Sequence, residues 1–359
     1  MTHAAPLLKP VSLGAINAAN RVFMAPLTRN RAGEGRVPTD LHVEYYRQRA
    51  GFGVVVTEAT VVSPQAVGYI DTPGLYTDEQ VAGWRRVTDA VHEAGGTIIV
   101  QLWHVGRVSH TDFHDGRAPV GPTDANAEGM TFTSDGFVPT SDPRALRTDE
   151  IAGIVDDFAA AARRAEAAGF DGVEIHGANG YLLEQFLAAG VNDRTDRYGG
   201  GSITDRARFA LQVVDAVSEV IGTSRTGIRL SLGNGTSNAV DTDPAPTLSY
   251  LGGQLAERGI AFVHVVEGLE DHVQVTALRD GGWDGPVILN GGYDLERGVA
   301  TVEAGTADAI AYGRLAIANP DLPTRFERGA ALNEPNNDTF YGGGAEGYTD
   351  YPSLDDGQE

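Results

Sequence analysis

The chain has 359 residues, 42% of them hydrophobic and 21% charged, so it can bury one large core or two ordinary ones. Its 27 basic and 49 acidic residues give a formal net charge of −22, and a field of this sign would repel nucleic acid and anionic lipid, so we expect neither as a partner. Cysteine is absent, which excludes disulfides, thiol catalysis and cysteine-ligated iron–sulfur clusters.

The amino-terminal segment predicts one small hairpin and no targeting signal. Residues 1–6 lack the basic and apolar regions of a signal peptide, and no apolar run has the length of a membrane span. We therefore expect a cytoplasmic protein that is not bound to a membrane. Residues 7–20 alternate apolar and polar side chains around Gly14, a pattern that predicts a hairpin.

From residue 22 onward the chain repeats one pattern, in which an amphipathic helix is followed by a glycine and a short β-branched run. The clearest helical stripe starts with a capping-box pattern, Thr77-x-x-Gln80, and stops at Gly95. Another stripe begins after Thr148, the expected N-cap, and ends near Gly169. The β-branched runs predict eight strands, at residues 22–25, 54–58, 97–101, 172–176, 227–231, 261–266, 287–290 and 308–312.

Strands that alternate with helices imply right-handed βαβ units and a parallel sheet. Eight repeats favour a closed (β/α)8 barrel over an open doubly wound sheet, and no Gly-x-Gly-x-x-Gly motif follows any of the strands. We therefore predict an α/β protein that forms a single (β/α)8 TIM barrel over residues 1–359. The hairpin of residues 7–20 would close the floor of this barrel.

Two segments are longer than a minimal barrel needs. Residues 102–148 lie between the third strand and its helix and are rich in Gly, Pro, Asp, Ser and Thr. A loop of this length is usually functional, so we expect an insertion that caps the active site at the barrel mouth. The tail from about residue 333 has no helical stripe, and we expect it to pack back on the domain.

Active sites of such barrels form where the strands end. Taken singly, a glutamine or arginine there more often bonds loop backbone, and a tyrosine or tryptophan more often packs. Taken together, the residues at the predicted strand ends form a coherent polar set: Pro26, Thr28, Ala59, Gln101, Trp103, His176, Asn179, Tyr181, Arg229, Gly291, Gly292, Gly313 and Arg314.

Residues 172–181 carry the clearest chemistry. His176 stands at the end of an apolar run, and Asn179 and Tyr181 follow within five residues. Histidine and asparagine can aim two N–H donors at one oxygen, and tyrosine is a weak acid. These groups make up the protein's half of a reduction. The hydride must come from a cofactor, because no side chain can supply one.

Several motifs follow one another along nearly the whole chain: Met24-Ala25-Pro26-Leu27-Thr28-Arg29, Gln101-Leu102-Trp103-His104-Val105-Gly106-Arg107, His176-Gly177-Ala178-Asn179-Gly180-Tyr181-Leu182, Arg197-Tyr198-Gly199-Gly200, Tyr312-Gly313-Arg314 and the tail 339–352. The series resembles the old yellow enzyme family, especially the branch close to bacterial ene-, nitrate-ester- and morphinone-type reductases. The resemblance implies FMN at the barrel mouth and NAD(P)H as the hydride donor.

The resemblance also implies how FMN is held. Gln101 would offer a donor and an acceptor to the flavin pyrimidine, Arg229 would place positive charge near N1, and Thr28 would hydrogen-bond near O4. Glycine would let the backbone approach the phosphate, which an arginine would bind. The remaining contacts implied are Pro26, Ala59, Gly291, Gly292, Gly313 and the phosphate ligand Arg314.

For the reaction, the resemblance implies that His176 and Asn179 bind the carbonyl or nitro oxygen of an activated alkene. Hydride would then add from flavin N5, and Tyr181 would protonate the α-carbon. Because asparagine does not titrate, we expect substrate binding to persist above the pKa of the histidine. The residues expected to shape the substrate pocket are Tyr69, Trp103 and Tyr341, although plain packing explains Tyr69 and Trp103 equally well.

Alternatives stay open at this point. Nitrate esters, nitro compounds and quinones present the same oxygen and are alternative substrates. Amine dehydrogenase or dienoyl-CoA reductase relatives share the barrel, but they need an iron–sulfur cluster and further domains. A phosphate-binding isomerase barrel would use Gly313 and Arg314 without a flavin, and a non-catalytic flavin protein would leave Tyr181 without a purpose. The sequence does not distinguish a monomer from a homodimer or NADPH from NADH, and it suggests no metal site.

Some conspicuous residues are interpreted as structural. His264 lies in an apolar strand and is expected to be a core histidine with its hydrogen bonds satisfied, and His42 and His104 are expected to be structural as well. The glycines before Ser202 are read as a turn into a capped helix. Leu232 stands where the family often has proline, which predicts an altered loop after the fifth strand.

Overall fold

The computed structural model describes residues 3–267 and 272–354. The strands in this part of the chain are β1 (Val11–Leu13), β2 (Ile16–Ala18), β3 (Val22–Met24), β4 (Val55–Val61), β5 (Ile98–Trp103), β6 (Val120–Gly121), β7 (Met130–Thr133), β8 (Gly136–Pro139), β9 (Arg144–Ala145), β10 (Gly172–Gly177), β11 (Thr226–Leu230), β12 (Phe262–Val266), β13 (Val287–Asn290) and β14 (Ala309–Tyr312). The helices are α1 (Asp40–Arg47), α2 (Asp78–Glu93), α3 (Ile151–Ala168), α4 (Leu182–Leu187), α5 (Ile203–Ile221), α6 (Ala245–Arg258), α7 (Val273–Asp280), α8 (Leu295–Glu303), α9 (Arg314–Ala318) and α10 (Leu322–Arg328).

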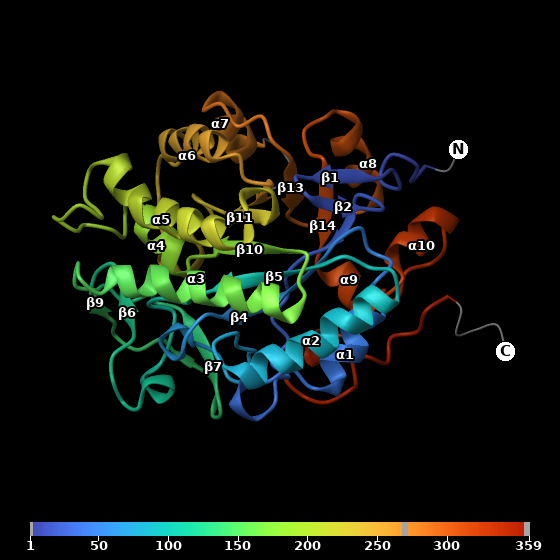
Figure 1. Cartoon of the computed structure of the whole chain (residues 1–359), viewed down its shortest axis with the longest axis horizontal. Helices are drawn as coiled ribbons and strands as arrows, with labels where there is room; N and C mark the ends of the chain where they lie inside the picture. Colours follow the sequence, from blue (N-terminus) through green and yellow to red (C-terminus); the bar gives the residue numbers. More distant parts are fainter. Residues whose placement is uncertain (1–2, 268–271, 355–359) are drawn as a thin grey trace.

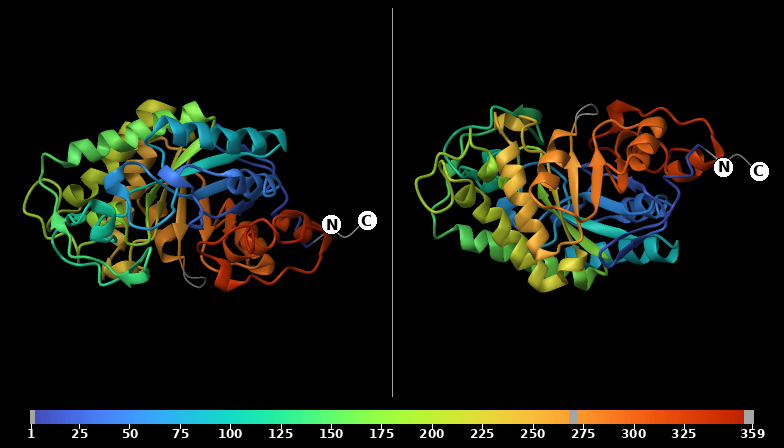
Figure 2. Two further views of the ribbon diagram at one scale, coloured as in Figure 1. Left: turned by 90° about the horizontal axis from the view of Figure 1, so that it is seen from below. Right: turned by 90° about the horizontal axis from the view of Figure 1, so that it is seen from above.

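Eight parallel strands close into a barrel in the order β3, β4, β5, β10, β11, β12, β13 and β14, and β14 pairs again with β3. Figures 1 and 2 show the strands in the interior and helices such as α2, α3, α5 and α6 along the outside. Each of the eight predicted strands coincides with one barrel strand, so the predicted (β/α)8 architecture is confirmed. The strands are buried on both faces, which is why the sequence shows continuous β-branched runs rather than alternation.

The predicted amino-terminal hairpin closes the floor of the barrel. Strands β1 and β2 pair antiparallel, and the turn between them bonds the segment before β11, with the Ala15 N–H donating to the Ser224 carbonyl at 2.8 Å. A Cβ on Gly172, the first residue of β10, would lie 2.6 Å from the Ile16 side chain. Ile16 therefore packs against the amino ends of the strands, and the mouth at their other end is left for chemistry.

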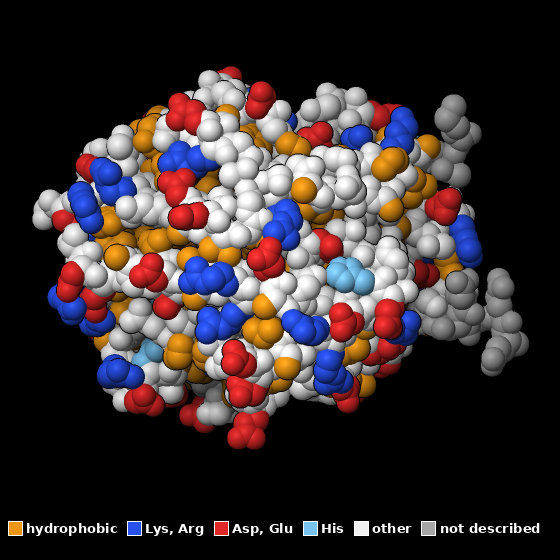
Figure 3. Space-filling model, in the orientation of Figure 1, with side chains coloured by type: hydrophobic (Ala, Val, Ile, Leu, Met, Phe, Trp, Pro, Cys, Tyr) orange, Lys and Arg blue, Asp and Glu red, His pale blue; other side chains and the backbone are white. Residues whose placement is uncertain are grey.

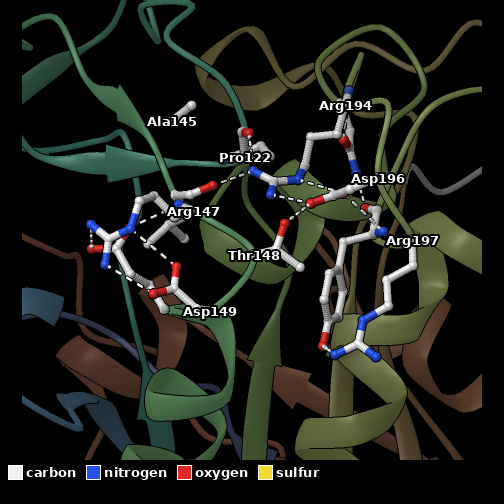
Figure 4. Close-up of polar contacts among 12 residues, drawn as sticks. Pro122, Ala145, Arg147, Thr148, Asp149, Arg194, Asp196 and Arg197 are labelled. Atoms are coloured by element: carbon white, nitrogen blue, oxygen red, sulfur yellow. Dashed lines mark hydrogen bonds and ion pairs between the residues drawn. The ribbon is translucent and has the colours of Figure 1, made fainter.

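The helix boundaries test two capping predictions. At α2 the capping box is confirmed, since the Thr77 side chain accepts from the Gln80 N–H. The N-cap prediction at Thr148 is wrong, because α3 begins only at Ile151. The Thr148 hydroxyl donates instead to the Asp196 carboxylate, which Arg194 already holds at 3.0 Å and whose pKa these bonds lower (Figure 4). The Thr148 hydroxyl thus binds the charged carboxylate of Asp196, which is distant in the sequence, and does not cap α3.

The insertion and the tail both reach the barrel mouth. Strands β7 and β8 form an antiparallel hairpin inside residues 102–148, and β5 extends to Trp103, so the insertion begins two residues later than predicted. The tail has a single 3-10 turn (Asn337–Thr339) and is held by the buried Arg29, whose guanidinium donates to the carbonyls of Phe340 and Gly347, both at 2.8 Å. The tail is therefore anchored by backbone acceptors rather than by a helical face.

On the face shown in Figure 3, basic side chains are scattered among acidic ones and form no continuous basic patch. In residues 3–267 and 272–354, no helix combines the length and the apolar character that crossing a membrane requires.

We expect Arg29→Lys to lower the free energy of unfolding by about 2–4 kcal/mol, because one ammonium cannot reach all the carbonyls that the buried guanidinium serves. The measurement is urea unfolding. Arg47→Lys is the matched control, since its exposed pair with Glu44 contributes at most about 1 kcal/mol. Equal losses in the two variants would contradict the assigned role of Arg29.

Candidate active site

A cavity of about 410 Å³ opens at the mouth of the barrel. Its wall contains 12 of the 15 residues predicted for the site: Pro26, Thr28, Ala59, Tyr69, Gln101, Trp103, His176, Asn179, Tyr181, Arg229, Arg314 and Tyr341. The other three, Gly291, Gly292 and Gly313, are not among the lining residues. Strand ends that lie up to 288 positions apart in the sequence (26 to 314) would not meet without closure of the barrel.

Seven further residues line the cavity and were missed: Leu27, Asn30, Met130, Phe132, Phe137, Ile317 and Phe340. Three of them lie on the β7–β8 hairpin. An Asp-Gly pair at 135–136 between apolar residues is a strong hairpin signal, so this part of the wall could have been found in the sequence.

His176 is a neutral hydrogen-bond donor. It is the last residue but one of β10, with 3% of its surface exposed, and its Nδ1 accepts from the Ala178 N–H at 3.3 Å. The neutral ring therefore carries its hydrogen on Nε2. Burial lowers the pKa of His176 well below 6.5, and the positive charge of Arg229 lowers it further.

Asn179 follows His176 in a sharp turn with left-handed backbone, φ 57° at Asn179 and 74° at Gly180. Asparagine tolerates this conformation better than most residues, and glycine adopts it freely. A Cβ at Gly180 would lie 2.2 Å from the Thr236 carbonyl oxygen, so only glycine fits there. The turn brings the Asn179 side chain to the same cavity as His176.

Tyr181 supplies a protonated phenol. Its hydroxyl donates to the Tyr69 hydroxyl at 3.2 Å, and its ring lies edge-on to His176, with the ring centres 5.0 Å apart. Burial raises the pKa of Tyr181 well above 10, and the neighbouring Tyr69 raises it further. Tyr69 in turn stacks on Trp103 at 5.5 Å, so these two rings both pack and line the cavity.

Beneath the cavity the barrel interior holds a buried polar network. The Gln101 amide donates to Glu174 at 2.7 Å, and His264 Nδ1 lies 2.7 Å from the other Glu174 oxygen. Arg229 donates to Asn290 at 2.8 Å. His264 is thus a core histidine, but its Nε2 has no partner among the described residues, so the expectation of full satisfaction is wrong. Glu174 was not predicted as part of this network, although it stands two positions before His176 and therefore shares its strand face.

The residues present fit a flavin phosphate and ring. Arg314 is exposed at the cavity wall and makes no hydrogen bond or ion pair within the described ranges. The Nε of Arg229 and the Nε1 of Trp103 are buried without a partner among the described residues. Such groups need an acceptor, which a bound ligand can supply. A strand irregularity between Val56 and Ala59 shifts the register where Ala59 meets the cavity.

The glycines differ in what they require. A Cβ at Gly291 would lie 1.9 Å from the Glu267 carbonyl oxygen, so the protein's own packing demands glycine there. At Gly313 φ is an ordinary −94°, and a Cβ would meet only Leu27 at 3.5 Å. One interpretation from the sequence is confirmed, since Ser202 caps α5 after the 199–201 glycines. Leu232 is buried, and the altered loop predicted from it stays a prediction.

Comparison with known proteins places the chain among flavin enzymes. Residues 6–333 match the NADH:flavin oxidoreductase / NADH oxidase family. The chain is 47% identical over 364 residues to 12-oxophytodienoate reductase 1 of Oryza sativa subsp. japonica, covering 98% of this chain and 94% of that protein. It is 45% identical over 370 residues to 12-oxophytodienoate reductase 2 of Arabidopsis thaliana, covering 98% and 97%.

Solved structures agree with this. Morphinone reductase superposes with a TM-score of 0.94 at 50% identity, covering 98% of this chain and 97% of that chain. A complex of morphinone reductase with tetrahydroNAD also has a TM-score of 0.94, at 51% identity, covering 98% and 99%. The old yellow enzyme homologue of Zymomonas mobilis has a TM-score of 0.93 at 41% identity, covering 97% and 99%.

We expect His176 to stay neutral, with its proton on Nε2, as the pH falls from 9 to 6. Nitrogen-15 chemical shifts of the histidine ring report this directly. In Arg229→Met the pKa of His176 should move upward, because one of the two main causes that lower it is removed. The appearance of an imidazolium ring above pH 6 in the unmodified protein would contradict this reading.

Proposed function

Because the chain belongs to the NADH:flavin oxidoreductase / NADH oxidase family and is an FMN-dependent NAD(P)H oxidoreductase, we propose that it reduces activated C=C bonds in the cavity at its barrel mouth. The observation that carries the proposal is the convergence of His176, Asn179 and Tyr181 on one cavity, with the histidine neutral and the tyrosine protonated. Two donors and one acid are what the protein must supply in such a reduction.

His176 and Asn179 bind the oxygen of the substrate. The Nε2–H of the histidine and the amide N–H of the asparagine withdraw electron density from the conjugated alkene and stabilise the enolate-like charge that develops on that oxygen. A neutral imidazole does this without a proton transfer, because its pKa is far below the working pH. Binding therefore does not weaken as the pH rises through neutrality.

Tyr181 delivers the proton to the α-carbon. Its raised pKa keeps the phenol protonated over the whole working range, so the acid is always ready. The phenolate left behind would be costly in this buried position, and the Tyr69 hydroxyl at 3.2 Å is the group placed to share or replace the proton.

FMN, when bound, supplies the hydride that NAD(P)H provides. Gln101, Thr28, Pro26 and Ala59 would hold its ring, and Arg229 would lie at the negative end of the pyrimidine. The Gln101 Nε2 donates one of its two hydrogens to Glu174, which leaves the other hydrogen to donate and Oε1 to accept at the ring. Gly291, Gly292, Gly313 and Arg314 would hold the phosphate. The Arg314 guanidinium, which has no partner in the described part of the chain, is the main support for this assignment.

The substrate wall is apolar and aromatic. Met130, Phe132 and Phe137 on the β7–β8 hairpin and Tyr341 on the tail line the cavity beside Tyr69 and Trp103, which favours a hydrophobic body that carries one oxygen. The relatives are named as reductases of 12-oxophytodienoate and of morphinone, names of oxo compounds, which supports a carbonyl-bearing substrate. Residues 102–148 would act as the cap of a single domain, working as a monomer or a homodimer in the cytoplasm.

The same donors suit a second group of oxidants. Nitrate esters, nitro compounds and quinones each present an oxygen to His176 and Asn179, and a quinone needs no proton on carbon. Tyr181 is the residue that separates these reactions from alkene reduction.

We expect Tyr181→Phe to slow reoxidation of the reduced enzyme by cyclohexenone by about 100-fold or more, because the proton donor is lost. Anaerobic stopped-flow spectroscopy follows the visible flavin band as NADPH bleaches it and cyclohexenone restores it. Bleaching by NADPH and reoxidation by a benzoquinone are the internal controls and should persist. Unchanged reoxidation by cyclohexenone would remove Tyr181 from the mechanism.

We expect Arg314→Ala to weaken FMN binding by about tenfold or more, because an unpaired guanidinium is removed from a phosphate site. Fluorescence titration of the apoprotein with FMN measures the Kd. Arg163→Ala, which removes an exposed arginine from the outer face of α3, is the charge-matched control and should leave the Kd unchanged. If both variants bind FMN as tightly as the parent, the phosphate lies elsewhere.

A further inference from the structure

The turn that carries Asn179 needs support. Two consecutive residues, Asn179 and Gly180, have left-handed backbone between the end of β10 and the start of α4. A non-glycine residue in this conformation is strained, and such strain persists only where the surroundings hold it in place. What holds this turn therefore controls where the Asn179 amide points.

Three hydrogen bonds link the turn to Glu184 and Ser231. The Asn179 N–H donates to Ser231 Oγ at 2.6 Å, and the Ser231 hydroxyl donates to Glu184 Oε2 at 2.7 Å. The Gly180 N–H donates to the same Oε2 at 3.0 Å, which closes a ring. The backbone N–H groups can only donate, so the serine must accept from Asn179 and pass its own hydrogen to the carboxylate.

Glu184 has no other visible purpose. Its side chain is fully buried, it does not line the cavity, and no ion pair involves it within the described part of the chain. Its second oxygen, Oε1, is buried without a hydrogen-bond partner there. A buried carboxylate without a cation lowers stability, so this residue is not explained by packing.

We propose that Glu184 and Ser231 are positioning residues for the second oxygen donor of the active site. They hold the Asn179–Gly180 turn in its left-handed conformation, so that the Asn179 amide and His176 Nε2 meet the same substrate oxygen. Neither residue touches the substrate, and both act through Asn179. The proposal rests on the proposed function, in which Asn179 binds that oxygen.

The barrel register explains why Ser231 serves this purpose. His176 on β10 lies opposite Arg229 on β11, so the residue that follows β11 comes level with the turn after β10. Leu232 is buried beside it, and the loop beyond it presses the Thr236 carbonyl against Gly180. The loop after β11, which contains Leu232, thus packs against the Asn179–Gly180 turn.

The ionisation of Glu184 gives a test that needs no mutation. Burial raises the pKa of Glu184 to about 7, so the ionised carboxylate predominates only above neutral pH. This ionised form is the better acceptor for the hydrogen bonds from Gly180 and Ser231. The two histidines near it stay neutral in this range. His176 on β10 and His104, whose carbonyl accepts from Leu182 of α4, have pKa values lowered by burial, His104 to about 3.

The charged groups nearby are three arginines and one aspartate at the far end of α4. Arg229 lies on β11, Arg107 binds the loop carbonyls at 237 and 238, and Arg206 of α5 binds the Leu187 carbonyl. Asp241 accepts from the Ala189 N–H beyond the end of α4.

The decisive experiment is a double-mutant cycle on kcat/KM for cyclohexenone at pH 8, with Glu184→Gln, Asn179→Ala and the double variant of the full-length holoenzyme. We expect Glu184→Gln to lower kcat/KM by about tenfold, because a neutral amide oxygen accepts more weakly than a carboxylate. In the Asn179→Ala background the same change should have an effect of less than about twofold, since its target is gone. Multiplicative losses in the double variant would overturn the proposal.

The pH profile and the stability provide the second readout. In the parent protein kcat/KM should rise through a single step near pH 7, and this step should vanish in Glu184→Gln. Asp157→Asn is the matched control and should keep the step, because Asp157 is a partly buried carboxyl elsewhere in the molecule whose pKa is also raised. The Tm of Glu184→Gln at pH 8 should not fall, because the buried charge is removed. A lower Tm together with an unchanged profile would mark Glu184 as merely structural.

Ser231→Ala keeps the test open if Glu184→Gln does not fold. It should lower kcat/KM for cyclohexenone in the same sense and should lose its effect in the Asn179→Ala background. If Asn179→Ala itself leaves kcat/KM unchanged, the proposed function fails. If Asn179→Ala lowers it but the Glu184 and Ser231 variants do not, only the positioning role fails.

Discussion

Closure of the parallel barrel is the constraint on which the rest of the molecule depends. Because all eight strands run the same way, their carboxyl ends meet at one mouth, and the register between neighbours decides which side chains share a layer. Strand β10 lies between β5 and β11, which puts Glu174 opposite Gln101 and His176 opposite Arg229. Groups on three separate strands thus become one contiguous polar layer beneath the cavity.

That layer fixes protonation states as well as positions. Burial, together with the Arg229 charge, keeps the His176 ring neutral, and the Glu174 carboxylate partly offsets the lowering of the Arg229 pKa by burial. Burial meanwhile keeps the Tyr181 phenol protonated. The protonation states of the donor, the cation and the acid are therefore set by their burial and by their charged neighbours.

Local periodicity was enough to predict the barrel and the residues at its strand ends, because β-branched runs and the glycines that end helices are patterns of neighbouring residues. The failures are long-range. Thr148 is a good local cap, but Asp196 lies within its reach only in the folded chain. Glu184 and Ser231 stand 47 positions apart, and no sequence pattern says that they touch. The β7–β8 hairpin is different, because its Asp-Gly turn is a local signal from which the hairpin could have been predicted.

The residues of the active site include several whose conformation or burial lowers the stability of the fold. Asn179 is held in a left-handed conformation. Within residues 3–267 and 272–354, Glu184 is buried without a cation beside it, and the Nε of Arg229 has no partner. Apolar residues of similar volume would stabilise the last two positions, and glycine would relax the first. The fold tolerates these departures because the floor hairpin lies at the opposite end of the barrel and the tail is anchored on Arg29 by hydrogen bonds to its backbone carbonyls. The mouth can therefore be tuned by its polar groups while the stability of the fold is supplied elsewhere.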